Sequence, residues 1–282
     1  MAEAADRLRA AGLARAEGEA ARLVQRASGL DGADYLLGLD RPVPCRAGAH
    51  LEAMVRRRLA GEPLQYVVAQ WGFRSLDLLL DQRVLIPRPE TEQVAEVAIA
   101  ELRRLGRDRL TVTAVDLGTG SGAIGLSLAV EVATARVWAT DRSAAALAVA
   151  RANLAGIGRP ATRVRLIRGD WFGALPEEMR AGVDLIVANP PYVASGDALL
   201  PEVADWEPAE ALMAGPSGLE AIERIVAGAP AWLARPGVLV LEVAAHQARA
   251  VTALAARAGL EEVEVRPDLA GQERVVVARA WS

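Results

Sequence analysis

The alternation of strand-like and helix-like stretches from residue 111 onward most constrains the fold of this 282-residue chain. Short apolar runs of strand length are separated by stretches in which apolar residues recur at helical spacing. The strand-like runs cover residues 111–117, 135–140, 163–168, 184–188, 237–243, 261–266 and 274–280. Strands that alternate with helices form a parallel sheet covered on both faces. The pattern therefore predicts an α/β fold.

The last two strands depart from this alternation. They are joined by residues 267–273, a segment too short for a crossover helix. We therefore expect a final hairpin and a seven-stranded sheet in which the last strand is antiparallel.

The N-terminal part predicts a small helical domain over residues 1–66. Within residues 3–27, apolar side chains recur at helical spacing among arginines and glutamates. A second short helix is expected near Asp34–Leu39, and a third over Ala47–Leu59, where glycine and proline follow.

Residues 67–88 predict a β-hairpin linker. Gln70–Pro87 resembles a strand pair with a tight turn near Asp81-Gln82. A helix over Glu92–Leu105 is expected next, so that residues 89–282 form the second domain.

Charge composition argues against a general nucleic-acid binder. The chain has 36 acidic and 32 basic residues, for a net charge of −4. We expect no stable nucleic-acid partner, and a monomer.

Cysteine and histidine usage argues against a metal site or an internal disulfide. Cys45 is the single cysteine, and the two histidines, His50 and His246, lie far apart in the sequence.

No apolar run has the roughly 18–20 residues that span a bilayer, and the N-terminus lacks a signal-peptide core. We expect a cytoplasmic protein without a membrane partner.

The first strand of the alternating region ends in a glycine loop, VDLGTGSGAIG, over residues 115–125. Its Gly120-x-Gly122-x-x-Gly125 spacing matches the dinucleotide fingerprint, and Asp141 follows about 20 residues later. An acid at that place binds ribose hydroxyls, which NAD and S-adenosylmethionine both present. The loop alone leaves both cofactors open.

Two later motifs favour S-adenosylmethionine. Gly169-Asp-Trp-Phe172 ends the third strand and offers a carboxylate for an exocyclic amine and an indole for a purine face. Asn189-Pro-Pro-Tyr192 ends the fourth strand, where consecutive prolines cannot continue a ladder. A hydride-transfer enzyme has no use for that motif.

The Asn189–Tyr192 motif suits methyl transfer to a planar nitrogen. Such a nitrogen is a poor nucleophile because its lone pair is delocalised. Two acceptors, the Asn189 side-chain oxygen and the Pro190 carbonyl, would bind its two N–H bonds most strongly as positive charge develops. Tyr192 would stack on the flat target group and position it.

These motifs, in this order and spacing, resemble class I S-adenosylmethionine-dependent methyltransferases, which have a Rossmann-like sheet. Ile86-Pro-Arg-Pro-Glu-Thr-Glu92, together with Asp268-Leu-Ala-Gly-Gln-Glu-Arg274, is more narrowly similar to the release-factor glutamine N5-methyltransferases. This resemblance implies methylation of the glutamine in the Gly-Gly-Gln motif of peptide chain release factors 1 and 2. It also implies that the helical domain docks the protein substrate.

The resemblance also implies site residues. The cofactor contacts map onto Gly118, Thr119, Gly120, Ser121, Gly122, Asp141, Asp170, Trp171 and Asn189. The substrate contacts map onto Asn189, Pro190, Pro191 and Tyr192, of which Asn189, Pro190 and Tyr192 are the expected catalytic residues. Arg88, Glu90 and Thr91 are candidates to line the cofactor cleft, and Asp116 is expected to brace the glycine loop.

Alternatives remain at this point. A ribosomal-protein glutamine methyltransferase shares the asparagine-proline-proline-tyrosine motif but usually differs around residues 86–92. An N6-adenine methyltransferase of nucleic acid uses the same motif, but usually needs a basic surface or an added recognition domain. An NAD-dependent dehydrogenase and a non-enzymatic binding protein account for fewer of the motifs.

Overall fold

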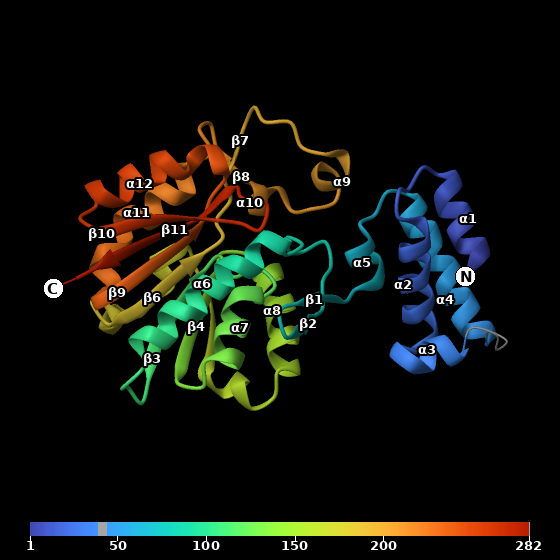
Figure 1. Ribbon diagram of the computed structural model, residues 1–282, viewed down its shortest axis with the longest axis horizontal. Coiled ribbons are helices and arrows are strands. Elements are labelled where there is room, and N and C mark those ends of the chain that lie inside the picture. The colour runs from blue at the N-terminus through green and yellow to red at the C-terminus, as the bar shows by residue number, and fades with distance from the viewer. Residues whose placement is uncertain (39–43, 282) are drawn as a thin grey trace. The chain divides into compact units, whose positions relative to one another are not determined.

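A computed structural model describes residues 1–38 and 44–281 of the chain (Figure 1). The chain divides into two compact units. The first unit comprises Met1–Trp71 together with Leu200–Trp206, and the second comprises Gly72–Leu199 together with Glu207–Ser282.

The first unit is helical. Its helices are α1 (Ala2–Ala10), α2 (Ala16–Ser28), α3 (Gly32–Gly38), α4 (Cys45–Leu59), α5 (Leu64–Val68) and α9 (Pro201–Ala204). Leu8, Leu23 and Met54 are fully buried among α1, α2 and α4, which accounts for the spacing of apolar residues in this part of the sequence.

Three predicted helices can be compared with this unit. The stretch 3–27 is two helices rather than one, because the chain turns after α1 and Gly12 adopts a left-handed φ of 84°. The predicted helix near Asp34–Leu39 begins two residues earlier as α3, and Leu39 lies outside the described residues. The third predicted helix is confirmed as α4.

Helix α9 joins the first unit although it follows the fourth strand of the sheet in sequence. Arg58 on α4 lies 2.7 Å from Glu19 on α2 and 3.1 Å from Glu202 on α9. The Arg58 and Glu19 side chains are only 11% and 15% exposed, so this ion pair is largely shielded from water, whereas the Glu202 side chain is 48% exposed. A single guanidinium therefore links α2, α4 and α9.

The second unit contains the predicted seven-stranded sheet. Its strands are β3 (Val112–Leu117), β4 (Ala135–Asp141), β5 (Val164–Arg168), β6 (Val183–Ala188), β9 (Leu233–Glu242), β10 (Glu261–Pro267) and β11 (Glu273–Ala280). The spatial order is β10-β11-β9-β6-β3-β4-β5. Strand β11 is antiparallel to both neighbours and the remaining pairs are parallel, as the sequence predicted.

Helices cover both faces of this sheet, with α11 (Glu220–Trp232) and α12 (Ala248–Arg257) on one face (Figure 1). The other face carries α6 (Pro89–Leu105), α7 (Ala123–Glu131) and α8 (Ala144–Gly156). Helix α6 begins three residues earlier than predicted, because Pro89 suits the first turn of a helix. All six residues of the central strand β6 are buried, so the core lies on both sides of it.

The predicted linker hairpin differs in register from the observed one. A two-stranded sheet forms from β1 (Trp71–Phe73) and β2 (Leu76–Leu78), so the connection lies at residues 74–75. The turn predicted near Asp81-Gln82 exists, since the Val84 N–H donates to the Asp81 carbonyl at 3.1 Å, but it joins no paired strands. Before that turn, the backbone of Leu79 exchanges two hydrogen bonds with the Asn153 side chain instead of a strand.

The remaining elements are short. They are η1 (Arg159–Arg163), η2 (Trp171–Ala174), η3 (Glu177–Met179), β7 (Val193–Ala194), α10 (Ala209–Leu212), β8 (Met213–Gly215) and η4 (Ala245–Gln247). Within the described ranges, no helix is long and apolar enough to cross a membrane.

Strand order locates the site. From β3 the chain proceeds to β4 and β5 on one side, then returns to place β6 on the other side of β3. Ligands of open α/β sheets bind at such a reversal, outside the carboxyl ends of the strands. The sequence motifs of interest follow β3, β4, β5 and β6, and their ends meet at this edge.

Candidate active site

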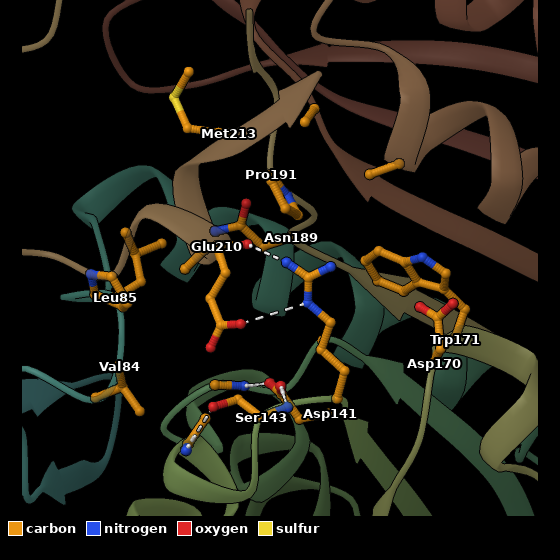
Figure 2. A pocket seen from close by; sticks show the side chains of 18 of the residues that line it. Val84, Leu85, Asp141, Ser143, Asp170, Trp171, Asn189, Pro191, Glu210 and Met213 are labelled. Carbon is orange, nitrogen blue, oxygen red and sulfur yellow. Dashed lines mark hydrogen bonds and ion pairs between the residues drawn. The ribbon is translucent and has the colours of Figure 1, made fainter. Parts of the chain in front are cut away.

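A pocket lies at this edge of the second unit (Figure 2). Its empty space, which includes a part open to solvent, amounts to about 960 Å³. Of the site residues predicted from the sequence, those that line it are Gly118, Gly120, Asp141, Asp170, Trp171, Asn189 and Pro191. Residues from four successive strand ends therefore converge on one pocket.

The glycine loop runs along the pocket with a left-handed backbone. Gly118 has a φ of 74° and Gly120 a φ of 57°, values that residues with a side chain rarely adopt. A Cβ on Gly118 would lie 3.3 Å from the Trp171 ring. The glycine therefore allows the indole to lie close against the loop.

Asp116 braces this loop from inside the sheet, as expected. Its Oδ2 accepts from the Thr119 hydroxyl at 2.6 Å and from the Gly125 N–H at 2.9 Å. The carboxyl is 1% exposed, and this burial raises the pKa of Asp116 to about 6.

The other predicted loop residues support the backbone. Thr119 and Ser121 are 7% and 3% exposed. The Thr119 hydroxyl is used by Asp116, and the Ser121 carbonyl accepts from the Asn153 amide at 2.9 Å. Gly122 begins helix α7 with a φ of 89°. In the described part of the chain, Thr119, Ser121 and Gly122 are not among the residues that line the pocket.

Asp141 ends β4 and holds two backbone N–H groups. Its Oδ2 accepts from Gly120 at 2.9 Å and its Oδ1 from Ser143 at 2.8 Å. Burial raises the pKa of Asp141, and these two hydrogen bonds oppose that effect. A carboxylate accepts about four hydrogen bonds, so Asp141 retains acceptor sites for a ligand.

Asp170 and Trp171 follow β5 on the same side of the pocket (Figure 2). Asp170 is half-exposed and lies 2.5 Å from Arg224. Trp171 adopts a left-handed φ of 47°, which is unfavourable for a residue with a Cβ. That conformation accompanies the placement of its ring beside Gly118.

The asparagine-proline-proline-tyrosine segment begins one residue after β6. Asn189 is partly buried, and its amide nitrogen donates to the Thr91 hydroxyl at 3.2 Å. Pro190 is buried, and the Tyr192 carbonyl accepts from the Gln247 amide at 3.0 Å. Burial and the nearby Glu242 carboxylate raise the pKa of Tyr192 to about 12.

Two further residues, Thr91 and Glu242, lie behind this segment. The Thr91 hydroxyl donates to Glu242 Oε2 at 2.8 Å. Glu242 is 1% exposed at the end of β9, and burial raises its pKa to about 7. Sequence reasoning did not single out Glu242, although a carboxylate at the carboxyl end of the apolar run Val238–Leu241 was the available signal.

The three candidates at the N-terminal end of α6, where Arg88 is the N-cap residue, occupy other positions. Arg88 lies 2.5 Å from Glu207, which also accepts from the Ile86 N–H at 3.2 Å. Within the described part of the chain, Arg88, Glu90 and Thr91 are not among the residues that line the pocket.

Comparisons with known proteins indicate the same fold. A family model described as "PrmC N-terminal domain" matches residues 1–68, and one described as "Methyltransferase small domain" matches residues 99–204. Among solved structures, the hMettl16 catalytic domain has a TM-score of 0.53 at 14% identity, covering 84% of this chain and 81% of that one. A methyltransferase from Pyrococcus furiosus has a TM-score of 0.51 at 16% identity, covering 82% and 98%. The fold is that of the class I methyltransferases.

Sequence relatives identify the family. The release factor glutamine methyltransferase of Cereibacter sphaeroides is 44% identical over 98% of this chain and 95% of its own length. The proteins of the same name from Moorella thermoacetica and Bordetella pertussis are 42% and 43% identical, covering 99% and 86% of this chain and 96% and 90% of their own. The chain belongs to the release factor glutamine methyltransferase family.

Proposed function

We propose that this protein transfers a methyl group from S-adenosylmethionine to the side-chain amide nitrogen of the glutamine in the Gly-Gly-Gln motif of release factors 1 and 2. The observation that carries the proposal is the position of Asn189 at the end of β6, beside a pocket built by the glycine loop and Asp141. Membership of the family supports the substrate.

The pocket residues fit the proposed cofactor. Asp141 keeps free acceptor sites for the ribose hydroxyls after binding Gly120 and Ser143. The indole of Trp171 offers a flat apolar face for the adenine ring, and Asp170 offers an acceptor for its exocyclic amine. The cofactor supplies an electrophilic methyl group on a positively charged sulfur.

Asn189 and Pro190 prepare the glutamine nitrogen for attack. The Asn189 amide oxygen and the Pro190 carbonyl accept its two N–H bonds, which draws the lone pair out of conjugation with the glutamine carbonyl. Both acceptors act more strongly as positive charge develops on the nitrogen, so they stabilise the transition state more than the bound substrate. The proton then leaves the methylated nitrogen, which has become acidic, so a strong general base is unnecessary.

The prolines and Tyr192 provide geometry. Pro191 has no N–H that could donate in competition with the N–H bonds of the target, and its ring restricts the direction of the Pro190 carbonyl. Tyr192 presents an aromatic face on which the planar carboxamide stacks, while Gln247 holds the Tyr192 backbone. A target held in this way approaches the methyl group with less loss of freedom.

We extend the proposal to the helical unit, in which residues 1–66 act as the substrate-docking domain. The match of residues 1–68 to the "PrmC N-terminal domain" model supports a family-specific role for this part of the chain.

Intact-mass spectrometry of an unmodified release factor tests the function. The factor is incubated with this protein and S-adenosylmethionine, and unmodified DNA and ribosomal proteins are incubated in parallel. We expect a single added methyl group of about 14 Da that maps to the Gly-Gly-Gln glutamine. Label on DNA adenine or on a ribosomal-protein glutamine, without transfer to the release factor, would reject the substrate and retain the chemistry.

A further inference from the structure

A buried chain of hydrogen bonds lies behind Asn189. Thr91, in the first turn of α6, and Glu242, the last residue of β9, are 2% and 1% exposed. Thr91 Oγ1 lies 2.8 Å from Glu242 Oε2 and 3.2 Å from the Asn189 amide nitrogen. Since neither Thr91 nor Glu242 lines the pocket within the described part of the chain, both act on the reaction through their neighbours, Thr91 through Asn189 and Glu242 through Thr91 and Tyr192.

The number of protons in this series of hydrogen bonds determines which end of the Asn189 amide faces Thr91. A threonine hydroxyl has one proton, and an ionised carboxylate accepts hydrogen bonds but donates none. With Glu242 ionised, the Thr91 proton is committed to the carboxylate, and the hydroxyl oxygen can only accept. The partner that satisfies it is the NH2 group of Asn189, because the amide oxygen has no proton to give.

We propose that Glu242, acting through Thr91, is the positioning residue that keeps the amide oxygen of Asn189 turned toward the methyl-accepting nitrogen. This inference rests on the proposed function. The two ends of a carboxamide have nearly the same shape, so packing alone distinguishes them poorly. A reversed amide would present N–H donors to the N–H bonds of the target, and the acceptor would be lost.

The surroundings of Glu242 make this orientation depend on pH. The charged and titratable groups that face it are Arg274, Glu90 and Tyr192. Burial raises the pKa of Glu242 to about 7, with Thr91, Arg274 and Tyr192 favouring the ionised form and Glu90 opposing it. Once protonated, Glu242 can donate to Thr91, the Thr91 proton is released toward Asn189, and the amide is free to reverse.

A pair of matched variants at Thr91 tests the inference. Thr91→Val keeps the shape of the side chain and removes the hydroxyl, whereas Thr91→Ser keeps the hydroxyl and removes a methyl group. Turnover at saturating release factor and S-adenosylmethionine is measured by intact mass, and cofactor affinity by calorimetry. We expect Thr91→Val to lower kcat about tenfold, with the cofactor Kd and the substrate KM within about twofold, and Thr91→Ser to retain most of kcat.

The outcomes separate the two levels of the proposal. If the natural protein transfers no methyl group to the release factor, the proposed function is wrong and the positioning role falls with it. If the natural protein is active and both variants match it, the positioning role alone is wrong. Equal losses in both variants, or a cofactor Kd that rises as much as kcat falls, would assign Thr91 a merely structural role.

Glu242→Gln provides a second test that does not depend on the folding of Thr91→Val. Glutamine is close to glutamate in size and does not titrate. For the natural protein we expect kcat to fall about tenfold between pH 8 and pH 6, and for the variant to change less than twofold. Asp116, whose pKa burial raises to about 6, is present in both proteins and serves as the internal control. An identical pH profile for the two proteins would overturn the role of Glu242.

Discussion

The Asp141→Ala variant distinguishes two contributions of this carboxylate, one to the stability of the free protein and one to its affinity for the cofactor. In the free protein, the carboxylate accepts from the Gly120 N–H at 2.9 Å and from the Ser143 N–H at 2.8 Å. The bonds that we propose to the ribose hydroxyls exist only when the cofactor is bound. The first pair therefore contributes to the free energy of unfolding, and the second pair to the cofactor Kd.

The size of each effect follows from the number of bonds. A hydrogen bond to a charged group contributes about 1.5 kcal/mol at the low end of its range, which is the appropriate end for a half-buried carboxylate. Two such bonds give about 3 kcal/mol, and the burial that raises the pKa of Asp141 offsets part of it. We expect a loss of about 2 kcal/mol in the free energy of unfolding. Losing both ribose bonds, at about 1.4 kcal/mol each, would raise the Kd about 100-fold.

Urea unfolding without ligand measures the first quantity, and calorimetric titration with S-adenosylmethionine measures the second. Asp170→Ala is the matched control for unfolding, because that carboxylate lines the same pocket but is half-exposed and paired with Arg224. An exposed ion pair contributes little, so we expect this control to change the free energy of unfolding by less than about 0.5 kcal/mol. An unchanged Kd in Asp141→Ala would remove Asp141 from the ribose. Unchanged unfolding would refute its role in holding the glycine loop.

Three other perturbations address the remaining parts of the site. Asn189→Ala should lower kcat, measured by intact mass, by about 100-fold or more, while the cofactor Kd, measured by calorimetry, changes less than about threefold. A Kd that rises as much as kcat falls would contradict the acceptor role. Gly118→Ala forces a Cβ to within 3.3 Å of the Trp171 ring at a φ of 74°, so it should cost about 1–2 kcal/mol in urea unfolding. Because Glu242 has a folded-state pKa near 7, above its value in the unfolded chain, its contribution to stability decreases as pH rises from about 4.5 to 7. Glu242→Gln should therefore gain stability relative to the natural protein between pH 5 and pH 8 in urea unfolding, and a constant difference would show that the carboxyl does not titrate in this range.

The sheet could be predicted because each of its strands is specified by residues that are neighbours in the sequence. Each strand is a short apolar run with its own boundaries, and the seven-residue connection between the last two strands permits only a hairpin. The glycine loop and the two motifs that follow β5 and β6 could be placed on the same reasoning, since parallel strands bring their carboxyl ends together. The pocket accordingly contains Gly118, Asp141 and Asn189.

Features that depend on pairing between distant residues were not predictable. The linker hairpin has its connection at residues 74–75, and the backbone of Leu79 is hydrogen-bonded to Asn153, 74 positions further along the chain, rather than to a partner strand. The contact between Thr91 and Glu242 spans 151 positions. Nothing in the local sequence of either residue specifies the other.

The contribution of α9 to the first unit has a consequence for synthesis of the chain. This unit is assembled from two separate stretches, Met1–Trp71 and Leu200–Trp206. A nascent chain that has reached residue 71 lacks Glu202, so Arg58 then has Glu19 but not its second carboxylate. The N-terminal helices emerge first from the ribosome but gain their last helix only after β6 has been made. Their maturation as a folded unit therefore waits for more than half of the methyltransferase sheet to be translated.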